Sequence, residues 1–252
     1  MPRQTWHIIE GEAGCAYAVE RGCAAVIVDA LRASVTAAML FEAEASEILI
    51  VREVEEARAA RQAFPDALLY GERGGLPPDG FDFGNSPRDA AAAAGRRVIF
   101  TTTTGAGRML SAWGAPAVLM GSTVNASAVV SAASSVGADV VLIPAGLATD
   151  PGFDAQEDWA AAATIATCSG MLVGRGSDRY AYWCERIASE GLERLFQTAP
   201  HAAKLRTVGL GKDVAFCARC DITSAVPQAV ERNAFGLRCL PHPACRPAGY
   251  PS

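Results

Sequence analysis

The sequence is short of the residues and motifs that would assign it to several common enzyme classes. It has only three histidines, none of them near the polar motifs described below, which argues against a nucleophile activated by histidine. It contains no G-x-x-x-x-G-K-[ST] loop and no G-x-S-x-G elbow, so neither a P-loop nor an α/β-hydrolase nucleophile is expected. A phosphoaspartate site of the D-x-D type would need an acid at position 31, where the chain has Leu31.

Excess positive charge and long apolar runs are also missing. The 22 basic residues are outnumbered by 27 acidic ones, so the net charge of −5 gives no indication of nucleic-acid binding. No window approaches the roughly 18 uncharged apolar residues of a membrane span, and the first residues are not typical of a secretory signal. We therefore expect a cytoplasmic protein without membrane contact, in which arginines, a metal ion or helix N-termini bind small anions.

The eight cysteines show no compact disulfide spacing, and most are expected to be reduced packing residues. One cluster, Cys217-x-x-Cys220 followed by Cys239, His242 and Cys245, leaves a zinc site open. Its second half lacks a tight C-x-x-C pair, and Cys217 lies in an apolar run. Buried or tail thiols are therefore favoured over zinc.

The length of 252 residues predicts a single domain that spans residues 1–252. Residues 23–150 alternate short apolar runs with helical segments, whereas residues 151–252 form a helical part and a proline-rich, cysteine-bearing tail. Strands are predicted at 24–28, 48–51, 67–70, 97–100, 117–120 and 139–143, and helices at 36–45, 53–63, 87–94, 106–113, 126–136, 154–173 and 177–190. Such alternation is typical of an α/β protein with a largely parallel sheet covered on both faces. The tail is expected to add an edge strand or to wrap around the domain.

Polar residues follow the carboxyl ends of several predicted strands. In open α/β sheets, ligands bind at this edge, so loops distant in sequence are expected to line one pocket. The residues concerned are Asp29, Arg32 and Ser34, then Glu72 and Arg73, then Thr101–Thr104 with Gly105, and then Gly121, Ser122 and Asn125. Asn125 is also expected to cap the helix that follows it.

The residue types in this predicted pocket favour metal-assisted chemistry on an anion. Oxygen ligands that suit Mg²⁺ are available from Asp29, Glu72, Glu157 and Asp158. Arg32 and Arg73 offer planar donors for phosphate, sulfonate or carboxylate. Each residue alone has an ordinary structural explanation, such as capping a turn. Their joint placement favours phosphoryl transfer to water.

Residues 71–87, GERGGLPPDGFDFGNSP, form an unusual loop with neither a helical nor a strand period. Gly71-Glu72-Arg73 follows a predicted strand, so we expect it at the pocket edge with Arg73 facing an anion. Asn85 and Ser86 lead into a helix that begins with Pro87, and Ser86 is its expected N-cap. Asp82 is open to two interpretations, as a residue close to the metal or as a turn residue.

Taken in order, these motifs resemble those of the 2-phosphosulfolactate phosphatases of the ComB type, over roughly residues 23–230. The first half of the resemblance rests on Asp29-x-Leu31-Arg32-Ala33-Ser34-x-Thr36, Gly71-Glu72-Arg73-Gly74-Gly75 and Gly80-Phe81-Asp82-x-Gly84-Asn85-Ser86-Pro87. The second half rests on Thr101-Thr102-Thr103-x-Gly105, Gly121-Ser122-x-x-Asn125-Ala126-Ser127-Ala128, Pro144-Ala145-Gly146 and Glu157-Asp158.

The resemblance implies a Mg²⁺-dependent phosphatase with three α/β/α layers and a mostly parallel or mixed sheet. The family's substrate is (2R)-2-phospho-3-sulfolactate, which is hydrolysed to 3-sulfolactate and phosphate in coenzyme M biosynthesis. The chain departs from the family pattern at Thr104 and Ala106, where an asparagine and a threonine are usual, and at Ala30 and Val35. These departures concern the identity of the substrate more than the class of reaction.

Our hypothesis assigns a role to each of these residues. Asp29, Glu157 and Asp158 bind Mg²⁺, Arg32 and Arg73 bind the phosphate, and Glu72 or Asp29 orients the attacking water. The expected substrate-binding residues are Ser34, Asn85, Ser86, Thr102, Thr103, Thr104, Gly105, Arg108, Ser122 and Asn125. Direct attack by water and an aspartyl-phosphate intermediate both remain open, and so does a homodimer. The alternative is a non-catalytic anion-binding protein on the same scaffold.

Overall fold

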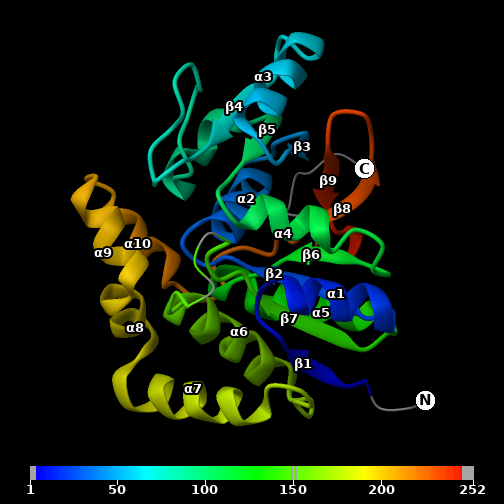
Figure 1. Cartoon of the computed structure of the whole chain (residues 1–252), viewed down its shortest axis with the longest axis vertical. Coiled ribbons are helices and arrows are strands. Elements are labelled where there is room, and N and C mark those ends of the chain that lie inside the picture. The colour runs from blue at the N-terminus through cyan, green and yellow to red at the C-terminus, as the bar shows by residue number, and fades with distance from the viewer. Residues whose placement is uncertain (1–3, 149, 151, 246–252) are drawn as a thin grey trace.

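The computed structural model describes residues 4–148, 150 and 152–245, and it shows an α/β protein built on a nine-stranded mixed sheet (Figure 1). The strands are β1 (Trp6–Ile8), β2 (Ala24–Val28), β3 (Glu47–Ile50), β4 (Leu68–Gly71), β5 (Arg97–Thr101), β6 (Val118–Met120), β7 (Val140–Pro144), β8 (Pro227–Arg232) and β9 (Leu237–Pro241). Their order across the sheet is β1-β7-β2-β6-β8-β9-β3-β5-β4. The mostly parallel or mixed sheet expected from the sequence is confirmed.

The helices cover both faces of this sheet, as a three-layer α/β/α fold requires. They are α1 (Gly11–Arg21), α2 (Ala33–Glu42), α3 (Val54–Ala63), α4 (Gly105–Ser111), α5 (Ala126–Ser135), α6 (Gln156–Ser169), α7 (Ser177–Glu190), α8 (Leu192–Thr198), α9 (Pro200–Thr207) and α10 (Gly211–Cys217). Three short 3₁₀ helices occur at η1 (Pro87–Ala93), η2 (Thr123–Asn125) and η3 (Pro243–Cys245). Strand β1 and helix α1 were not predicted from the sequence.

The C-terminal tail completes the centre of the sheet, which corrects the expectation of an edge strand or a wrap. Strands β1, β7, β2 and β6 are mutually parallel, and β3, β5 and β4 form a second parallel group. The β8–β9 hairpin lies between these groups and is antiparallel to β6 on one side and to β3 on the other. The two parallel groups therefore run in opposite directions, and their carboxyl ends do not share one edge.

Alternate side chains of the strands enter different apolar clusters, because successive residues of a strand point to opposite faces. One cluster joins β2 and β7 to α5, α6 and α8, and includes Val26, Leu142, Val129, Trp159 and Phe196. A second lies on the other face with α1, α2 and α4, and includes Ile27, Ile143, Ala18, Leu40 and Met109. A third packs α3 on the β3-β5-β4 group through Leu49, Ile99, Leu69, Ala57 and Ala60. Each fully buried aliphatic side chain contributes about 1.5–3 kcal/mol to stability.

Capping contacts occur at two helix starts, of which the one at Ser86 was predicted from the sequence. Glu53 and Glu56 form a capping box at the N-terminus of α3. The Ser86 side chain accepts a hydrogen bond from the Arg88 backbone N–H, and Pro87 is the first residue of η1. The segment after Ser86 is a 3₁₀ helix, however, and not the α-helix that its composition favours.

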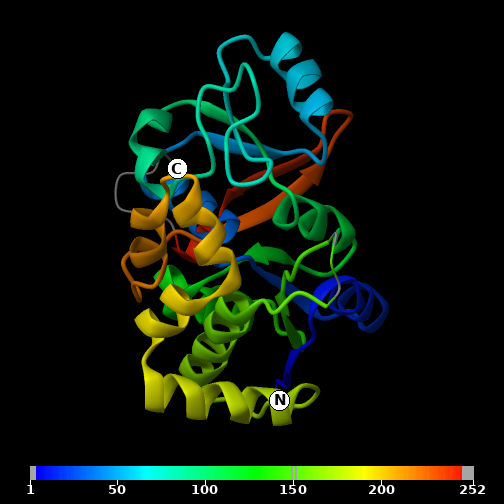
Figure 2. The same ribbon diagram turned by 60° about the vertical axis from the view of Figure 1, so that its left-hand side comes forward.

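Helices α6 to α10 form a continuous path along one side of the sheet before the chain returns to it as β8 and β9 (Figure 2). Helix α6 packs against α5, α7, α8 and β7, while α8, α9 and α10 contact one another. This path carries α9 to the side of the molecule where the loops after β2, β4 and β5 meet.

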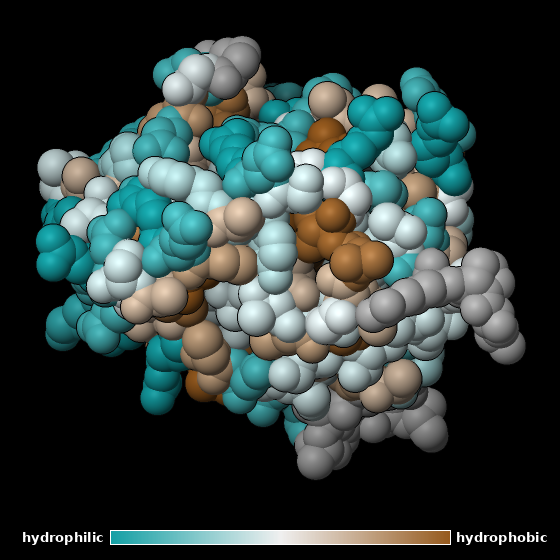
Figure 3. All heavy atoms as spheres, turned by 90° about the horizontal axis from the view of Figure 1, so that it is seen from below, coloured by the Kyte–Doolittle hydropathy of each residue, from teal (hydrophilic) through white to brown (hydrophobic). Residues whose placement is uncertain are grey.

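The face of the molecule seen from below is mostly polar in the part of the chain that the structure describes, with small separate apolar areas (Figure 3). The exposed large apolar side chains lie on different segments: Val19, Leu76, Leu172, Tyr182, Val230 and Phe235. No helix in the described part of the chain is long and apolar enough to cross a membrane.

The position of the hairpin generates a stability prediction. Leu237 is fully buried in β9 opposite Ile50, whereas Val230 in β8 is 41% exposed. We expect Leu237→Ala to lower the free energy of unfolding by about 2–4 kcal/mol, because it leaves a cavity inside the sheet. The matched variant Val230→Ala should change it by less than about 0.5 kcal/mol. Urea denaturation measures both, and equally small effects would contradict a central hairpin.

Candidate active site

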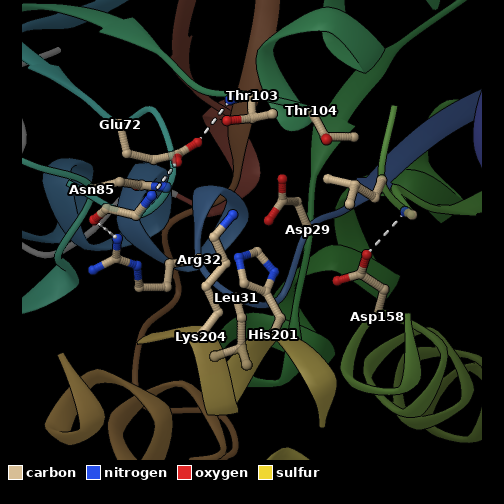
Figure 4. A pocket seen from close by; sticks show the side chains of 13 residues that line it. Asp29, Leu31, Arg32, Glu72, Asn85, Thr103, Thr104, Asp158, His201 and Lys204 are labelled. Atoms are coloured by element: carbon tan, nitrogen blue, oxygen red, sulfur yellow. Dashed lines mark hydrogen bonds between the residues drawn. The ribbon is translucent and has the colours of Figure 1, made fainter. Parts of the chain in front are cut away.

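A cavity open to solvent lies where the loops after β2, β4, β5 and β7 meet helix α9 (Figure 4). It is lined by Asp29, Leu31, Arg32, Glu72, Gly75, Asn85, Thr103, Thr104, Gly146, Leu147, Asp158, His201 and Lys204. Loops from both parallel groups of strands contribute to it. The convergence expected from the sequence is therefore present, although it does not arise from one shared sheet edge.

Asp29 follows β2 and is held by the turn that leads into α2. Its Oδ1 accepts a hydrogen bond from the Ala33 N–H at 3.2 Å, while its own N–H donates to Ser34 Oγ at 3.0 Å. The Oδ2 atom accepts no hydrogen bond from the described residues. Burial raises the pKa of Asp29 to about 6, with the charges of Glu72 and Glu157 adding to the rise and His201 and the Ala33 N–H opposing it.

Gly105 allows the start of α4 to approach Asp29 closely. A Cβ atom at this position would lie 2.7 Å from Asp29 Oδ2 and 2.8 Å from the Ala33 Cβ. Both distances are shorter than a carbon atom tolerates, so only glycine fits here. The structure thus gives Gly105 the role of bringing the threonine loop against Asp29.

Glu72 joins the loop after β4 to the loop after β5. Its Oε1 accepts the Thr103 N–H at 2.8 Å, and its Oε2 accepts the Gly75 N–H at 2.9 Å. Burial alone would raise the pKa of Glu72, but these two N–H groups, with help from the Thr103 hydroxyl and His201, lower it below its ordinary value. Glu72 is therefore an ionised residue that lines the cavity, and both of its carboxylate oxygens accept hydrogen bonds.

Arg32 lines the cavity, but its guanidinium is already engaged. Its Nη1 lies 2.6 Å from Asp213 Oδ2, and its Nη2 donates to the Gly75 carbonyl at 2.9 Å. The side chains of Arg32 and Asp213 are 2% and 1% exposed, so this is a buried ion pair. Ser86 Oγ donates to the other Asp213 oxygen. The sequence analysis did not identify Asp213, which belongs to the distant helix α10.

Arg73 does not face the cavity, which corrects the expectation for the loop at 71–87. Its guanidinium donates to the carbonyls of Glu72 and Arg52 and to Thr101 Oγ1. Glu72 and Arg73 are neighbours in an extended segment, so they point to opposite sides. Asp82 is a turn residue, since it accepts the Leu69 N–H and pairs with Arg61.

Asp158 lines the cavity from the first turn of α6, whereas its neighbour Glu157 lies behind the lining and contacts His201. Asp158 accepts the Ala30 N–H at 2.7 Å and the Gly146 N–H at 3.1 Å, which fixes the loops after β2 and β7. Burial, followed by the charges of Glu157 and Asp29, raises its pKa well above the ordinary value. Glu157 is also buried, and its Oε2 has no hydrogen-bond partner among the described residues.

Helix α9 supplies two residues that the sequence analysis missed, His201 and Lys204. They are three positions apart and so lie on the same side of the helix, and both point into the cavity (Figure 4). His201 Nδ1 lies 3.4 Å from Glu157 Oε1. Burial lowers the pKa of His201, but the hydrogen bond to Glu157 and the charges of Glu157, Asp29 and Glu72 raise it overall. The expectation that no histidine lies near the motifs is therefore wrong.

Several expected substrate-binding residues support the loops instead. Ser34 Oγ donates to the Ile27 carbonyl, and Thr102 Oγ1 accepts the Ala106 N–H. Asn125 does not cap α5 through its side chain. Its Oδ1 accepts the Ser122 N–H, and its Nδ2 donates to the Ala225 carbonyl.

Of the seven other expected substrate contacts, three line the cavity, and four do not: Ser86, Gly105, Arg108 and Ser122. Asn85, Thr103 and Thr104 line the cavity, and Asn85 Oδ1 is buried without a hydrogen-bond partner among the described residues. Arg108 pairs with Glu12 at 2.7 Å and donates to the Ala145 carbonyl, facing a neighbouring surface depression.

Neither the carboxylates nor the cysteines of the described residues form a ready metal site. Within residues 4–148, 150 and 152–245, no group of three or more His, Cys, Asp or Glu side chains is arranged to hold a metal ion. The zinc interpretation of the C-terminal cysteines is thus not supported. All eight cysteines are free, and Cys217, Cys239 and Cys245 are buried. Asp29, Glu157 and Asp158 influence one another's charge without forming such a group.

Comparison with known proteins connects this geometry to one family. A family model described as 2-phosphosulpholactate phosphatase matches residues 14–232, which is most of the chain. The match includes the loops after β2, β4, β5 and β7 as well as helices α6 to α10.

Individual relatives carry the same description. A probable 2-phosphosulfolactate phosphatase of Deinococcus radiodurans is 37% identical over 214 residues, covering 82% of this chain and 87% of the relative. One from Carboxydothermus hydrogenoformans is 33% identical over 205 residues, covering 81% and 85%. One from Thermus thermophilus is 36% identical over 209 residues, covering 80% and 86%.

The close approach at Gly105 can be tested with a matched pair of glycine variants. Gly105→Ala should destabilise the protein by about 1–3 kcal/mol, because the new methyl group displaces Asp29 and Ala33. At Gly107 on the same helix, a Cβ meets only the flexible end of Arg52 at 3.3 Å. Gly107→Ala should therefore be neutral or stabilise α4 by about 0.5–1 kcal/mol. Thermal or urea unfolding measures both, and equal effects would argue against the packing described for Gly105.

The raised pKa of Asp29 predicts a pH-dependent stability. The folded pKa of about 6 lies above the ordinary 3.8, so between these values the folded protein keeps a proton that the unfolded chain releases. The free energy of unfolding should therefore fall as pH rises from about 4 to about 6, and stay lower above that. Asp29→Asn should reduce this fall. Urea denaturation without added metal at about pH 4.5 and about pH 7.5 measures it. An identical pH dependence in both proteins would contradict the assignment.

Proposed function

The chain belongs to the 2-phosphosulfolactate phosphatase family, and from this premise we propose that it hydrolyses 2-phospho-3-sulfolactate or a related phosphorylated 2-hydroxy acid. The products would be the hydroxy acid and inorganic phosphate. The matching family model and the names of the relatives support phosphate-ester hydrolysis as the class of reaction. Placement of the reaction in the cytoplasm and in coenzyme M biosynthesis is part of the same proposal.

The observation that carries the proposal is the convergence of Asp29, Arg32 and Glu72 on one cavity from separate loops. Asp29 is the member with an unoccupied oxygen and a raised pKa. Buried carboxylates with perturbed pKa values in a cavity are typical of catalytic sites. This concentration of negative charge requires a cation if a phosphorylated anion is to bind beside it.

The donor set fits Mg²⁺, which prefers hard oxygen ligands and keeps several waters. Asp29 and Glu157 would hold the ion, because each has a carboxylate oxygen without a partner among the described residues. Asp158 would not ligate the ion directly, because both of its oxygens already accept backbone N–H groups, but its negative charge would favour a cation nearby. Two carboxylates suffice, because waters and phosphate oxygens complete the octahedron of this metal in many sites. When bound, Mg²⁺ would neutralise charge on the transferred phosphoryl group.

The chain's own residues would position the substrate and fix the walls of the cavity. Arg32 remains beside the phosphate position, with donors beyond the two already used by Asp213 and Gly75. The Asn85 amide, whose Oδ1 is unpartnered, and the Thr104 hydroxyl face the same space. Glu72 keeps the Thr103 loop in place and preserves the shape of the site. Such preorganised polar groups stabilise developing charge without reorganising during the reaction.

Phosphate release from 2-phospho-3-sulfolactate tests this proposal directly. We expect release that disappears on chelation and returns with Mg²⁺, and a fall of at least about 100-fold in kcat/KM for Asp29→Asn. Glu55→Gln makes the same carboxylate-to-amide change on an exposed face of α3 and should leave the rate unchanged. Full activity of Asp29→Asn would refute the role of Asp29. Thermal stabilisation by the substrate without any turnover would favour the anion-binding alternative.

A further inference from the structure

The cations that line the cavity are not equally available to a substrate. Arg32 is paired with Asp213, and the His201 ring lies beside Glu157. The side-chain amine of Lys204 has no hydrogen bond or ion pair with any described residue, and Thr207 Oγ1 donates only to its backbone carbonyl. It is therefore the one lining cation of the described chain whose charge no protein carboxylate balances.

Lys204 approaches the cavity from the side opposite the strand loops. It is an exposed residue of α9, and Figure 4 shows its side chain extending toward the cavity beside the His201 ring. Asp29, Thr103 and Thr104 enter from the other wall, which is where the metal and phosphate are proposed to lie. The amine thus reaches the cavity from the wall opposite the proposed metal and phosphate positions.

An ordinary explanation for Lys204 is a solvent-exposed lysine near the C-terminus of a helix, where positive charge is favourable. Arg206 in the same turn of α9 fits that explanation, because it is exposed and donates to Gln197 outside the cavity. Lys204 differs from it by lining the cavity. The sequence has only one other lysine, Lys212 on α10, which lies in a separate surface depression with Arg88 and Phe216.

We propose that Lys204 binds a second anionic group of the substrate, a carboxylate or sulfonate, and so selects phosphorylated hydroxy acids over plain phosphomonoesters. This inference rests on the proposed function and adds a residue that determines specificity. An ammonium group is suited to the task, since its three donors on a flexible stem adapt to either anion. The phosphate itself would stay with Arg32 and the groups on the opposite wall.

The test compares three secondary phosphate esters on the same three-carbon frame. Glycerol 2-phosphate has no further anion, 2-phosphoglycerate has a carboxylate, and 2-phospho-3-sulfolactate has a carboxylate and a sulfonate. For Lys204→Met we expect KM for 2-phospho-3-sulfolactate to rise about 10- to 100-fold, the effect of losing one charge-assisted hydrogen bond. The values of kcat for this substrate and of kcat/KM for glycerol 2-phosphate should stay within about twofold of the unmodified enzyme.

The 2-phosphoglycerate arm identifies the anion. A raised KM for this substrate as well assigns Lys204 to the carboxylate, whereas an effect confined to 2-phospho-3-sulfolactate assigns it to the sulfonate. Lys204→Arg keeps the charge and should recover most of the affinity. Lys212→Met removes the other lysine and should leave KM and kcat unchanged for all three substrates. An equal rise in KM for all three esters would indicate that Lys204 binds the phosphate. An unchanged KM for all three would indicate that Lys204 does not contact the substrate. Both results overturn the proposal.

Binding of the product 3-sulfolactate separates this inference from the proposed function. Calorimetry with the unmodified protein and Lys204→Met needs no turnover, and we expect 3-sulfolactate to bind about 10- to 100-fold more weakly to the variant. Equal binding to both proteins would refute the role of Lys204. Failure to hydrolyse any of the three esters would instead refute the proposed function.

Discussion

The buried ion pair between Arg32 and Asp213 connects the two parts of this protein. Arg32 belongs to the loop after β2, next to Asp29, and Asp213 belongs to α10 in the helical path along the sheet. The pair also holds the Gly75 carbonyl and the Ser86 hydroxyl, both in the loop of residues 71–87, so three segments meet here. Removing one partner of such a pair leaves a buried charge and costs about 3–5 kcal/mol. Helix α9, which carries His201 and Lys204, packs against α10 and so lies next to this contact.

Local patterns in the sequence were enough to predict the strands and helices of residues 24–143 and most of the cavity wall formed by their loops. Continuous apolar runs such as residues 24–28 indicate buried parallel strands, and polar residues directly after them mark the ends where ligands bind. Asp29, Glu72 and Thr103 were found in this way, and all three line the cavity. The Ser86-Pro87 start of η1 was predicted for the same reason, because a capping signal is local.

The rest depends on contacts between distant segments, which leave no local signal. Strand β9 pairs Cys239 with Ile48, and nothing in the tail indicates that it enters the centre of the sheet and not its edge. His201 and Lys204 lie on a short helix that packs against α8 and α10, far in sequence from the strand loops. Arg73 was misplaced because its neighbour Glu72 faces the cavity, and adjacent residues of an extended segment cannot both do so.

A crystal structure with Mg²⁺, orthophosphate and 3-sulfolactate would test the central claim, that strand loops bind the reacting phosphate while α9 binds the rest of the substrate. The account predicts Mg²⁺ at about 2.1 Å from an Asp29 oxygen. It also predicts the Lys204 amine within about 3 Å of the carboxylate or sulfonate. Phosphate on Lys204, or ligand bound at the depression that contains Lys212, would contradict it.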